Sequence, residues 1–319
     1  MGFICRLFAF GQVVELMGLI ELEGLTMNLE PEVRRGYSIS AEMKGVWKVQ
    51  MDLLKKLLDV CETYGLRIWA EGGTLLGAVR EHGYIPWDDD IDMAMFRDDY
   101  DKLVAVAPKE FNHPYFFQCA YTEKIYPRGH AQLRMDGTTA ILPYPEFVNT
   151  HQGIFIDIFP YDGVPDDSFS QDELIAKRNK MMAALRASAS SLSLLHPGRS
   201  FRPLRDRLRF KTLFRRFEDL MRENKVKENR IVSCLSFIVD PDHFFRDKQW
   251  YDGTILMPFE DILIPVPSGY HQILLRQYGD YMIPRQAPTY HGGFWKLDTN
   301  TPYQVYIPEL KRFLRCKNN

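Results

Sequence analysis

The 319-residue chain has few features that would indicate cysteine chemistry or binding to nucleic acid. Its five cysteines lie far apart and form no CxxC pair, which excludes a disulfide framework and a zinc knuckle. Lys and Arg number 40 against 42 Asp and Glu, and a net charge of −2 argues against a nucleic-acid partner. Internal repeats and low-complexity tracts are also absent. The chain has 45% hydrophobic and 26% charged residues, which is the composition of a globular protein.

The chain also has no long uninterrupted apolar run. Residues 1–25 are largely apolar, but Glu15 and Glu21 interrupt them, and no small-residue cleavage site follows. A membrane-spanning helix needs about 20 continuous apolar residues. Two explanations stay open: translation that really begins at Met27, or an amphipathic helix that contacts a membrane. We therefore treat residues 1–39 as an N-terminal extension and expect a cytoplasmic protein, with peripheral contact at the inner face of the membrane as a further option.

Hydrophobic periodicity predicts an alternation of helices and strands up to about residue 163. Apolar residues recur at helical spacing over residues 40–64, and Gly65 ends this helix. A second predicted helix runs from Gly72 to Arg80, and a third ends at Pro108. Buried strands are expected at residues 66–70, 91–96, 115–120, 130–135 and 153–159. Beyond residue 165 the pattern becomes helical, at residues 170–195, 203–230 and 267–279.

These elements predict an α/β (α+β) fold, with a mixed sheet flanked by helices. We expect a catalytic core at residues 40–165, a helical and basic insertion at 166–250, and a C-terminal segment at 251–319 that packs back on the core. Residues 196–230 hold twelve Lys and Arg against five Asp and Glu, so the rest of the chain has a net charge of −9. This basic stretch is either a solvated helical face or a docking surface for an anionic glycan acceptor or membrane.

The most informative stretch is residues 72–92, which places Asp88, Asp89, Asp90 and Asp92 within five positions. Residues two apart on a strand point to the same side, so Asp90 and Asp92 are expected to face one place. Oxygen-only ligands suit Mg²⁺ or Mn²⁺. Asp157 lies within an apolar run, where a carboxylate is costly unless it is paired or bound to metal. Asp88 is a further candidate ligand, with turn capping as the alternative.

Other residues near this stretch are further candidates for contact with the substrate. Gly72 and Gly73 stand between a strand and a helix, where backbone N–H groups approach a phosphate closely, and Arg80 adds positive charge to that helix. Arg134 either binds a phosphate or pairs with one of the aspartates. His151 either touches substrate or lies in an exposed loop.

The sequence GGTLLGAVREHGYIPWDDDID at residues 72–92 resembles the signature of the LicD family, to which the fukutin-related ribitol-phosphate transferases are also similar. Residues 132–139, 153–165 and 264–284 resemble later motifs of the family in the expected order. The resemblance implies a nucleotidyltransferase-type fold, with metal ligands at Asp90 and Asp92 and a third carboxylate at Asp157. The eukaryotic relatives have a zinc-finger loop, for which this chain has no cysteine cluster.

The resemblance also implies an activity. It is the metal-dependent transfer of a phospho-alcohol, such as phosphocholine, from a CDP-linked alcohol to a glycan hydroxyl, with release of CMP. The implied acceptor is a lipopolysaccharide, teichoic acid or capsule, and the implied proton acceptor is Asp157. The groups implied to steady the donor phosphates are Gly72, Gly73, Thr74, Arg80 and Arg134. The alternatives are a nucleotidyltransferase that moves NMP from an NTP to a sugar or alcohol phosphate, and a non-catalytic glycan- or nucleotide-binding protein. The complete set of three carboxylates argues against the non-catalytic alternative.

Overall fold

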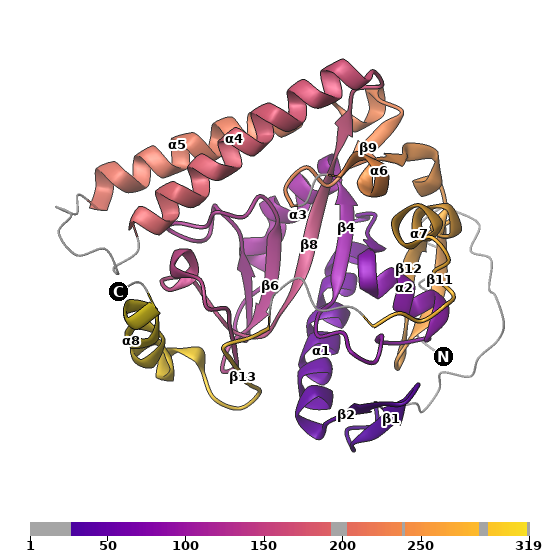
Figure 1. Cartoon of the computed structure of the whole chain (residues 1–319), viewed down its shortest axis with the longest axis vertical. Coiled ribbons are helices and arrows are strands. Elements are labelled where there is room, and N and C mark those ends of the chain that lie inside the picture. Colours follow the sequence, from indigo (N-terminus) through magenta and orange to yellow (C-terminus); the bar gives the residue numbers. More distant parts are fainter. Residues whose placement is uncertain (1–26, 193–202, 238–239, 287–292, 318–319) are drawn as a thin grey trace.

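The computed structural model describes residues 27–192, 203–237, 240–286 and 293–317 (Figure 1). The expectations about residues 1–26, including the choice between a start at Met27 and a membrane-contacting helix, lie outside this part of the chain. The helices are α1 (Ala41–Thr63), α2 (Gly72–Arg80), α3 (Arg97–Glu110), α4 (Ser168–Leu192), α5 (Pro203–Arg222), α6 (Pro241–Phe244), α7 (Tyr270–Tyr278) and α8 (Ile307–Lys317).

A seven-stranded mixed sheet forms the centre of the molecule. Its strands are β3 (Trp69–Ala70), β4 (Asp92–Phe96), β5 (Tyr115–Gln118), β6 (Ala131–Met135), β8 (Phe155–Val164), β9 (Ile231–Ser233) and β10 (Arg246–Asp247). Strand β8 pairs with β4 along one edge, and with first β6 and then β9 along the other. The β4–β8 pair is parallel and the other pairs of this sheet are antiparallel. The N-terminal ends of β4 and β8 therefore meet at one edge.

Three antiparallel pairs of strands lie outside the central sheet. They are β1 (Glu32–Arg34) with β2 (Tyr37–Ile39), β7 (Thr139–Ile141) with β13 (Lys296–Asp298), and β11 (Thr254–Phe259) with β12 (Ile262–Pro267). The prediction of an α/β fold with a mixed sheet and flanking helices is confirmed.

Helix α1 packs on the sheet as its apolar spacing predicts. The Ser40 hydroxyl accepts a hydrogen bond from the Met43 N–H and so caps the first turn. Trp47, Leu54 and other residues on one face of the helix are completely buried in the main core. Gly65 follows the helix with φ = +62°, a left-handed conformation that glycine adopts without strain.

Helix α3 does not end at Pro108, as the sequence had indicated, but continues to Glu110. A proline removes the one hydrogen bond that its own N–H would have donated. The turn around it is retained, because the Phe111 N–H donates to the Ala107 carbonyl at 3.0 Å.

The predicted helical insertion at residues 166–250 also contains strands. Helices α4 and α5 lie side by side along one margin of the molecule (Figure 1) and share an apolar cluster of their own. However, β9 and β10 lie in the same interval and extend the central sheet. Strand β8 continues to Val164, beyond the expected end at residue 159, and its last residues need a partner for their backbone groups, which β9 provides.

Candidate active site

Three carboxylates converge at the edge of the sheet where β4 and β8 begin. Oxygen atoms of Asp90, Asp92 and Asp157 lie within 4.8 Å of one another. Asp92 is the first residue of β4 and lies directly opposite Asp157 on β8. The Asp157 N–H donates to the carbonyl of Ile91 at 2.9 Å, which fixes the two strands at this point. Strand pairing thus brings together carboxylates that are 65 positions apart in the sequence.

Asp90 precedes β4 rather than lying on it, and helix α1 holds its loop in place. The Trp47 indole N–H donates to the Asp88 carbonyl at 3.1 Å, and the Gln50 amide donates to the Asp89 carbonyl at 2.8 Å. The Tyr84 hydroxyl donates to the Gln50 side chain at 3.1 Å, and its ring stacks on Trp47 with centroids 4.4 Å apart. Side chains of a buried helix therefore position the backbone of the acidic loop.

The two glycines of α2 allow the helix to begin directly against these carboxylates. Gly72 has φ = +53°, and a β-carbon there would lie 3.3 Å from Asp92 Oδ2. A β-carbon on Gly73 would overlap with Asp88 Oδ2. The Thr74 hydroxyl accepts a hydrogen bond from the Asp92 N–H at 2.9 Å. This glycine turn (residues 72–74) places a helix N-terminus, with its partial positive charge, beside the acidic groups.

The electrostatics of this cluster favour a bound cation. Burial, and then the neighbouring Asp90 carboxylate, raise the pKa of Asp92 well above its ordinary value. The same two causes raise the pKa of Asp88. A divalent cation would remove the repulsion that causes part of this shift. The donor set consists of carboxylate oxygens alone, which fits Mg²⁺ or Mn²⁺.

The two arginines expected at the phosphates do not lie at the glycine turn. Arg80 ends α2, about 12 Å along the helix axis from Gly72. Its guanidinium donates to Glu81 at 2.6 Å and to the carbonyl of Tyr281 at 2.8 Å, so it ties α2 to the C-terminal segment. Arg80 therefore lies at the far end of α2 from the glycine turn, with its guanidinium bound to protein groups.

Arg134 is buried within the sheet, and its guanidinium binds groups of the sheet itself. Its guanidinium donates to Gln118 and, at 2.6 Å, to both the Gln132 side chain and the Gly153 carbonyl. Burial lowers its pKa to about 10. Within the described residues it has no ion pair with an aspartate, because amide oxygens already surround the guanidinium. Its place on the same face of β6 as Gln132 makes it a neighbour of the site.

His151 is neither exposed nor at the carboxylates. It is 8% exposed, and its Nε2 lies 2.8 Å from Asp136 Oδ1. The Gly153 N–H donates to its Nδ1 at 3.1 Å. Burial lowers the pKa of His151 to about 4. The neutral imidazole therefore connects Asp136, which follows β6, to Gly153, which precedes β8.

The structure adds a histidine that the sequence analysis did not consider. His130 immediately precedes β6, is 2% exposed, and places Nε2 at 3.2 Å from Asp157 Oδ1. Its signal in the sequence was the alternation of His130, Gln132 and Arg134, which is typical of one polar face of a strand. Gln132 lies directly opposite Asp157.

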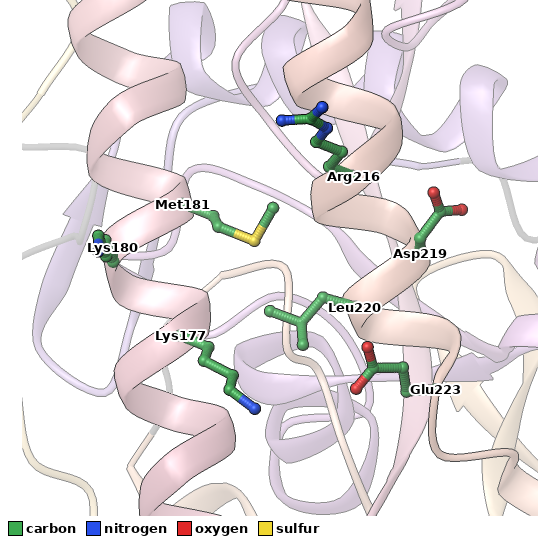
Figure 2. Close-up of a pocket in the computed structure, with 7 residues that line it drawn as sticks. All are labelled: Lys177, Lys180, Met181, Arg216, Asp219, Leu220 and Glu223. Atoms are coloured by element: carbon green, nitrogen blue, oxygen red, sulfur yellow. The ribbon is translucent and has the colours of Figure 1, made fainter.

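A separate hollow of about 440 Å³ lies between α4 and α5. Its lining includes Lys177, Lys180 and Arg216, together with Asp219 and Glu223 (Figure 2). Because the hollow has charges of both signs, it is not a simple anion site. The other exposed basic residues of α5 do not line the hollow; they are Arg205, Arg207, Arg209 and Arg215.

Comparison with known proteins gives this geometry a context. Residues 65–187 match the sequence model of the family described as LicD/FKTN/FKRP, nucleotidyltransferase domain. They include the glycine turn and all three carboxylates. The match covers 123 of the 319 residues, so this part of the chain is similar to the nucleotidyltransferase domain of the LicD family. A LicD-family relative, the lipopolysaccharide cholinephosphotransferase LicD of Haemophilus influenzae, is 29% identical over 241 residues, which cover 73% of this chain and 89% of that protein.

Two further relatives match shorter stretches. The uncharacterized protein RP689 of Rickettsia prowazekii is 27% identical over 168 residues, covering 53% of this chain and 58% of its own. The human ribitol 5-phosphate transferase FKRP is 46% identical over 43 residues, which are 14% of this chain and 9% of that protein. Among the described residues of this chain, no helix is long and apolar enough to cross a membrane.

Proposed function

We propose that this protein, which is similar to the LicD family, is a metal-dependent transferase. It moves a phospho-alcohol of the phosphocholine type from a CDP-linked donor to a hydroxyl of a cell-surface glycan and releases CMP. The observation that carries the proposal is the convergence of Asp90, Asp92 and Asp157 beside a helix N-terminus, in a chain similar to a lipopolysaccharide cholinephosphotransferase. A cytoplasmic location, with peripheral contact to the membrane that holds the acceptor, belongs to the same proposal.

Asp90, Asp92 and Asp157 would hold Mg²⁺ or Mn²⁺, with Asp88 as a further ligand. A metal held by these residues would supply neutralisation of the phosphate charge and a more electrophilic phosphorus. The glycine turn directs backbone N–H groups toward the donor phosphates. His130 contacts Asp157 at 3.2 Å and so restrains the carboxylate at the position where the acceptor hydroxyl is expected.

In the proposed reaction the acceptor oxygen forms a bond to the phosphorus that bears the alcohol. The bond from this phosphorus to the bridging oxygen breaks, and that oxygen leaves with CMP. Asp157 accepts the proton of the attacking hydroxyl. Catalysis of this kind depends mainly on positioning and charge neutralisation, which the rigid β4–β8 pair provides.

The test is incubation with a panel of CDP-alcohols, glycan acceptors and either Mg²⁺ or Mn²⁺, followed by measurement of CMP. CMP release that depends on metal and acceptor is the expected result. Release of pyrophosphate from an NTP would instead support the nucleotidyltransferase alternative. An Asp157→Asn variant should lose activity by orders of magnitude while its melting temperature stays near that of the wild type. A variant that loses only stability would assign Asp157 a structural role.

A further inference from the structure

Arg128 lies next to the carboxylate site, on the segment that leads into β6. Its Nη1 is 3.3 Å from His130 Nε2, and the same Nε2 is 3.2 Å from Asp157 Oδ1. The guanidinium also lies over the ring of Phe147, 4.8 Å from the centroid. Two short contacts therefore connect this cation to the carboxylate expected at the acceptor hydroxyl.

Arg128 differs from Arg246 and Arg97 because it has no anionic partner among the described residues. Arg246 binds Glu71, and Arg97 binds Asp162. The Arg128 Nε is buried and has no hydrogen-bond partner within the part of the chain that the structure describes. A half-buried cation with a buried donor of this kind is costly unless an anion binds to it.

Gln132 supplies a second donor beside Arg128. Its side chain is completely buried and lies directly opposite Asp157. The side-chain oxygen accepts from the Tyr126 hydroxyl at 3.0 Å and from Arg134 at 2.6 Å, which fixes the orientation of the amide. Its Nε2 has no hydrogen-bond partner among the described residues. The chain thus holds two buried donors on the β6 side of Asp157.

Helix α5 fixes the segment that carries Arg128. A β-carbon on Gly129 would lie only 2.7 Å from Phe217 Cε1, so the backbone of the segment is pressed against α5. Lys211, also on α5, donates to the Glu123 carbonyl at 2.6 Å and to the Ala120 carbonyl. This contact limits the freedom of residues 120–129 and gives the guanidinium a defined position.

We propose that Arg128 and Gln132 form an anion subsite that binds a phosphate of the donor on the β6 side of Asp157. The inference rests on the proposed function and extends it. A guanidinium presents N–H groups in a fork that fits two phosphate oxygens. The glycine turn lies beyond β4, on the other side of the carboxylates. A donor diphosphate is thereby held from both sides, with the metal ligands between them.

The experiment measures binding of CDP, CMP and pyrophosphate by calorimetry in the presence of Mg²⁺, for the wild type and for Arg128→Gln and Arg128→Lys. Lys124→Gln is the matched control, because it removes one positive charge from an exposed position of the same segment. We expect Arg128→Gln to weaken CDP binding about 10- to 100-fold, the range for a lost charged hydrogen bond. Arg128→Lys should give a smaller loss, and Lys124→Gln none.

The pattern across ligands identifies the phosphate. Weaker binding of CDP with unchanged binding of CMP assigns the subsite to the phosphate that bears the alcohol, whereas weaker binding of both assigns it to the cytidine-linked phosphate. Wild-type affinity for CDP and pyrophosphate in Arg128→Gln would overturn the proposal, and a lower melting temperature alone would make Arg128 a structural residue. If Arg128→Gln does not fold, the CDP affinity of Arg128→Lys decides in the same way.

Failure of the proposed function is a different result. In that case the wild type releases no CMP from any CDP-alcohol. Pyrophosphate binding that depends on Arg128 would still support the anion subsite, and pyrophosphate binding that does not depend on it would reject the subsite.

Discussion

The guanidinium of Arg246 binds both carboxylate oxygens of Glu71, with Nη1–Oε2 at 2.5 Å and Nη2–Oε1 at 2.6 Å. Both side chains are buried, and Arg246 also donates to the hydroxyls of Tyr161 and Tyr251. Glu71 immediately precedes the glycine turn, and its backbone N–H donates to the Asp92 carbonyl at 2.9 Å. The pair therefore connects β10 to the residues that position the carboxylate cluster.

Replacing Arg246 with methionine should destabilise the protein by about 3–5 kcal/mol, because it leaves the buried Glu71 carboxylate without its cation. Urea unfolding monitored by circular dichroism measures this change. A double variant, Glu71→Gln with Arg246→Met, should recover part of the loss. The control is Arg230→Met, which removes an exposed ion pair with Asp247 and should cost less than about 1 kcal/mol. Equal losses in the two single variants would contradict the proposed importance of the buried pair.

Asp92→Asn and Asp90→Asn should each abolish turnover and leave the fold intact. Removing one acid relieves repulsion at a crowded site, so the melting temperature without metal should hold or rise. Addition of Mg²⁺ or Mn²⁺ should raise the melting temperature of the wild type but not of Asp92→Asn, because a ligand that binds only the folded state stabilises it. Scanning fluorimetry measures both effects. Wild-type rates in either variant would remove the basis for the metal assignment.

His151 predicts a loss of stability in mild acid. Its pKa falls from 6.5 to about 4 in the folded protein, so the unfolded chain binds more protons between these values. The lowered pKa of His151 therefore adds to the free energy of unfolding. This addition is complete above pH 6.5, is lost as the pH falls through 4, and amounts to roughly 3 kcal/mol. Unfolding free energies at several pH values should therefore decrease less steeply for His151→Gln than for the wild type. If the free energies of unfolding of the two proteins change with pH in the same way, the folded state does not require a neutral His151 ring.

Four exposed arginines of α5 test the docking hypothesis for the basic stretch. Reversing Arg205, Arg209, Arg215 and Arg216 to Glu should raise the KM for an anionic glycan acceptor and leave the KM for the donor nearly unchanged. The effect should shrink at high ionic strength, because salt screens exposed charges. Reversal of Arg312 and Arg315, which are exposed on α8, controls for a general change in charge. Unchanged acceptor kinetics at low salt would mean that the stretch is a solvated face.

The sequence predicted the parts of the site that are local. The glycine turn and the acidic residues lie within 21 positions, and the apolar run around Asp157 marked a buried strand, so both could be found without knowledge of the tertiary structure. The partners of Arg80 and Arg134 could not be found in this way. Arg80 contacts the carbonyl of Tyr281, 201 positions away. Arg134 binds the amide oxygens of Gln118 on β5 and of Gly153, which precedes β8.

Arginines look alike in a sequence, and only tertiary packing decides which one keeps donors available for a ligand. The same holds for the strands in the basic interval. Residues 231–233 are too few to give a periodic signal, and they form β9 because β8 offers an open edge there.

All ten residues of β8 are buried, and three strands pair with it. Asp157 therefore cannot shift relative to Asp92 without breaking registers on both edges of the strand. We therefore expect opening for substrate and release of product to involve peripheral segments, such as helix α7, and not the strands that carry the carboxylates. In solution, conformational exchange on the microsecond-to-millisecond timescale should accordingly be confined to these segments, while the amides of β8 behave as a rigid frame.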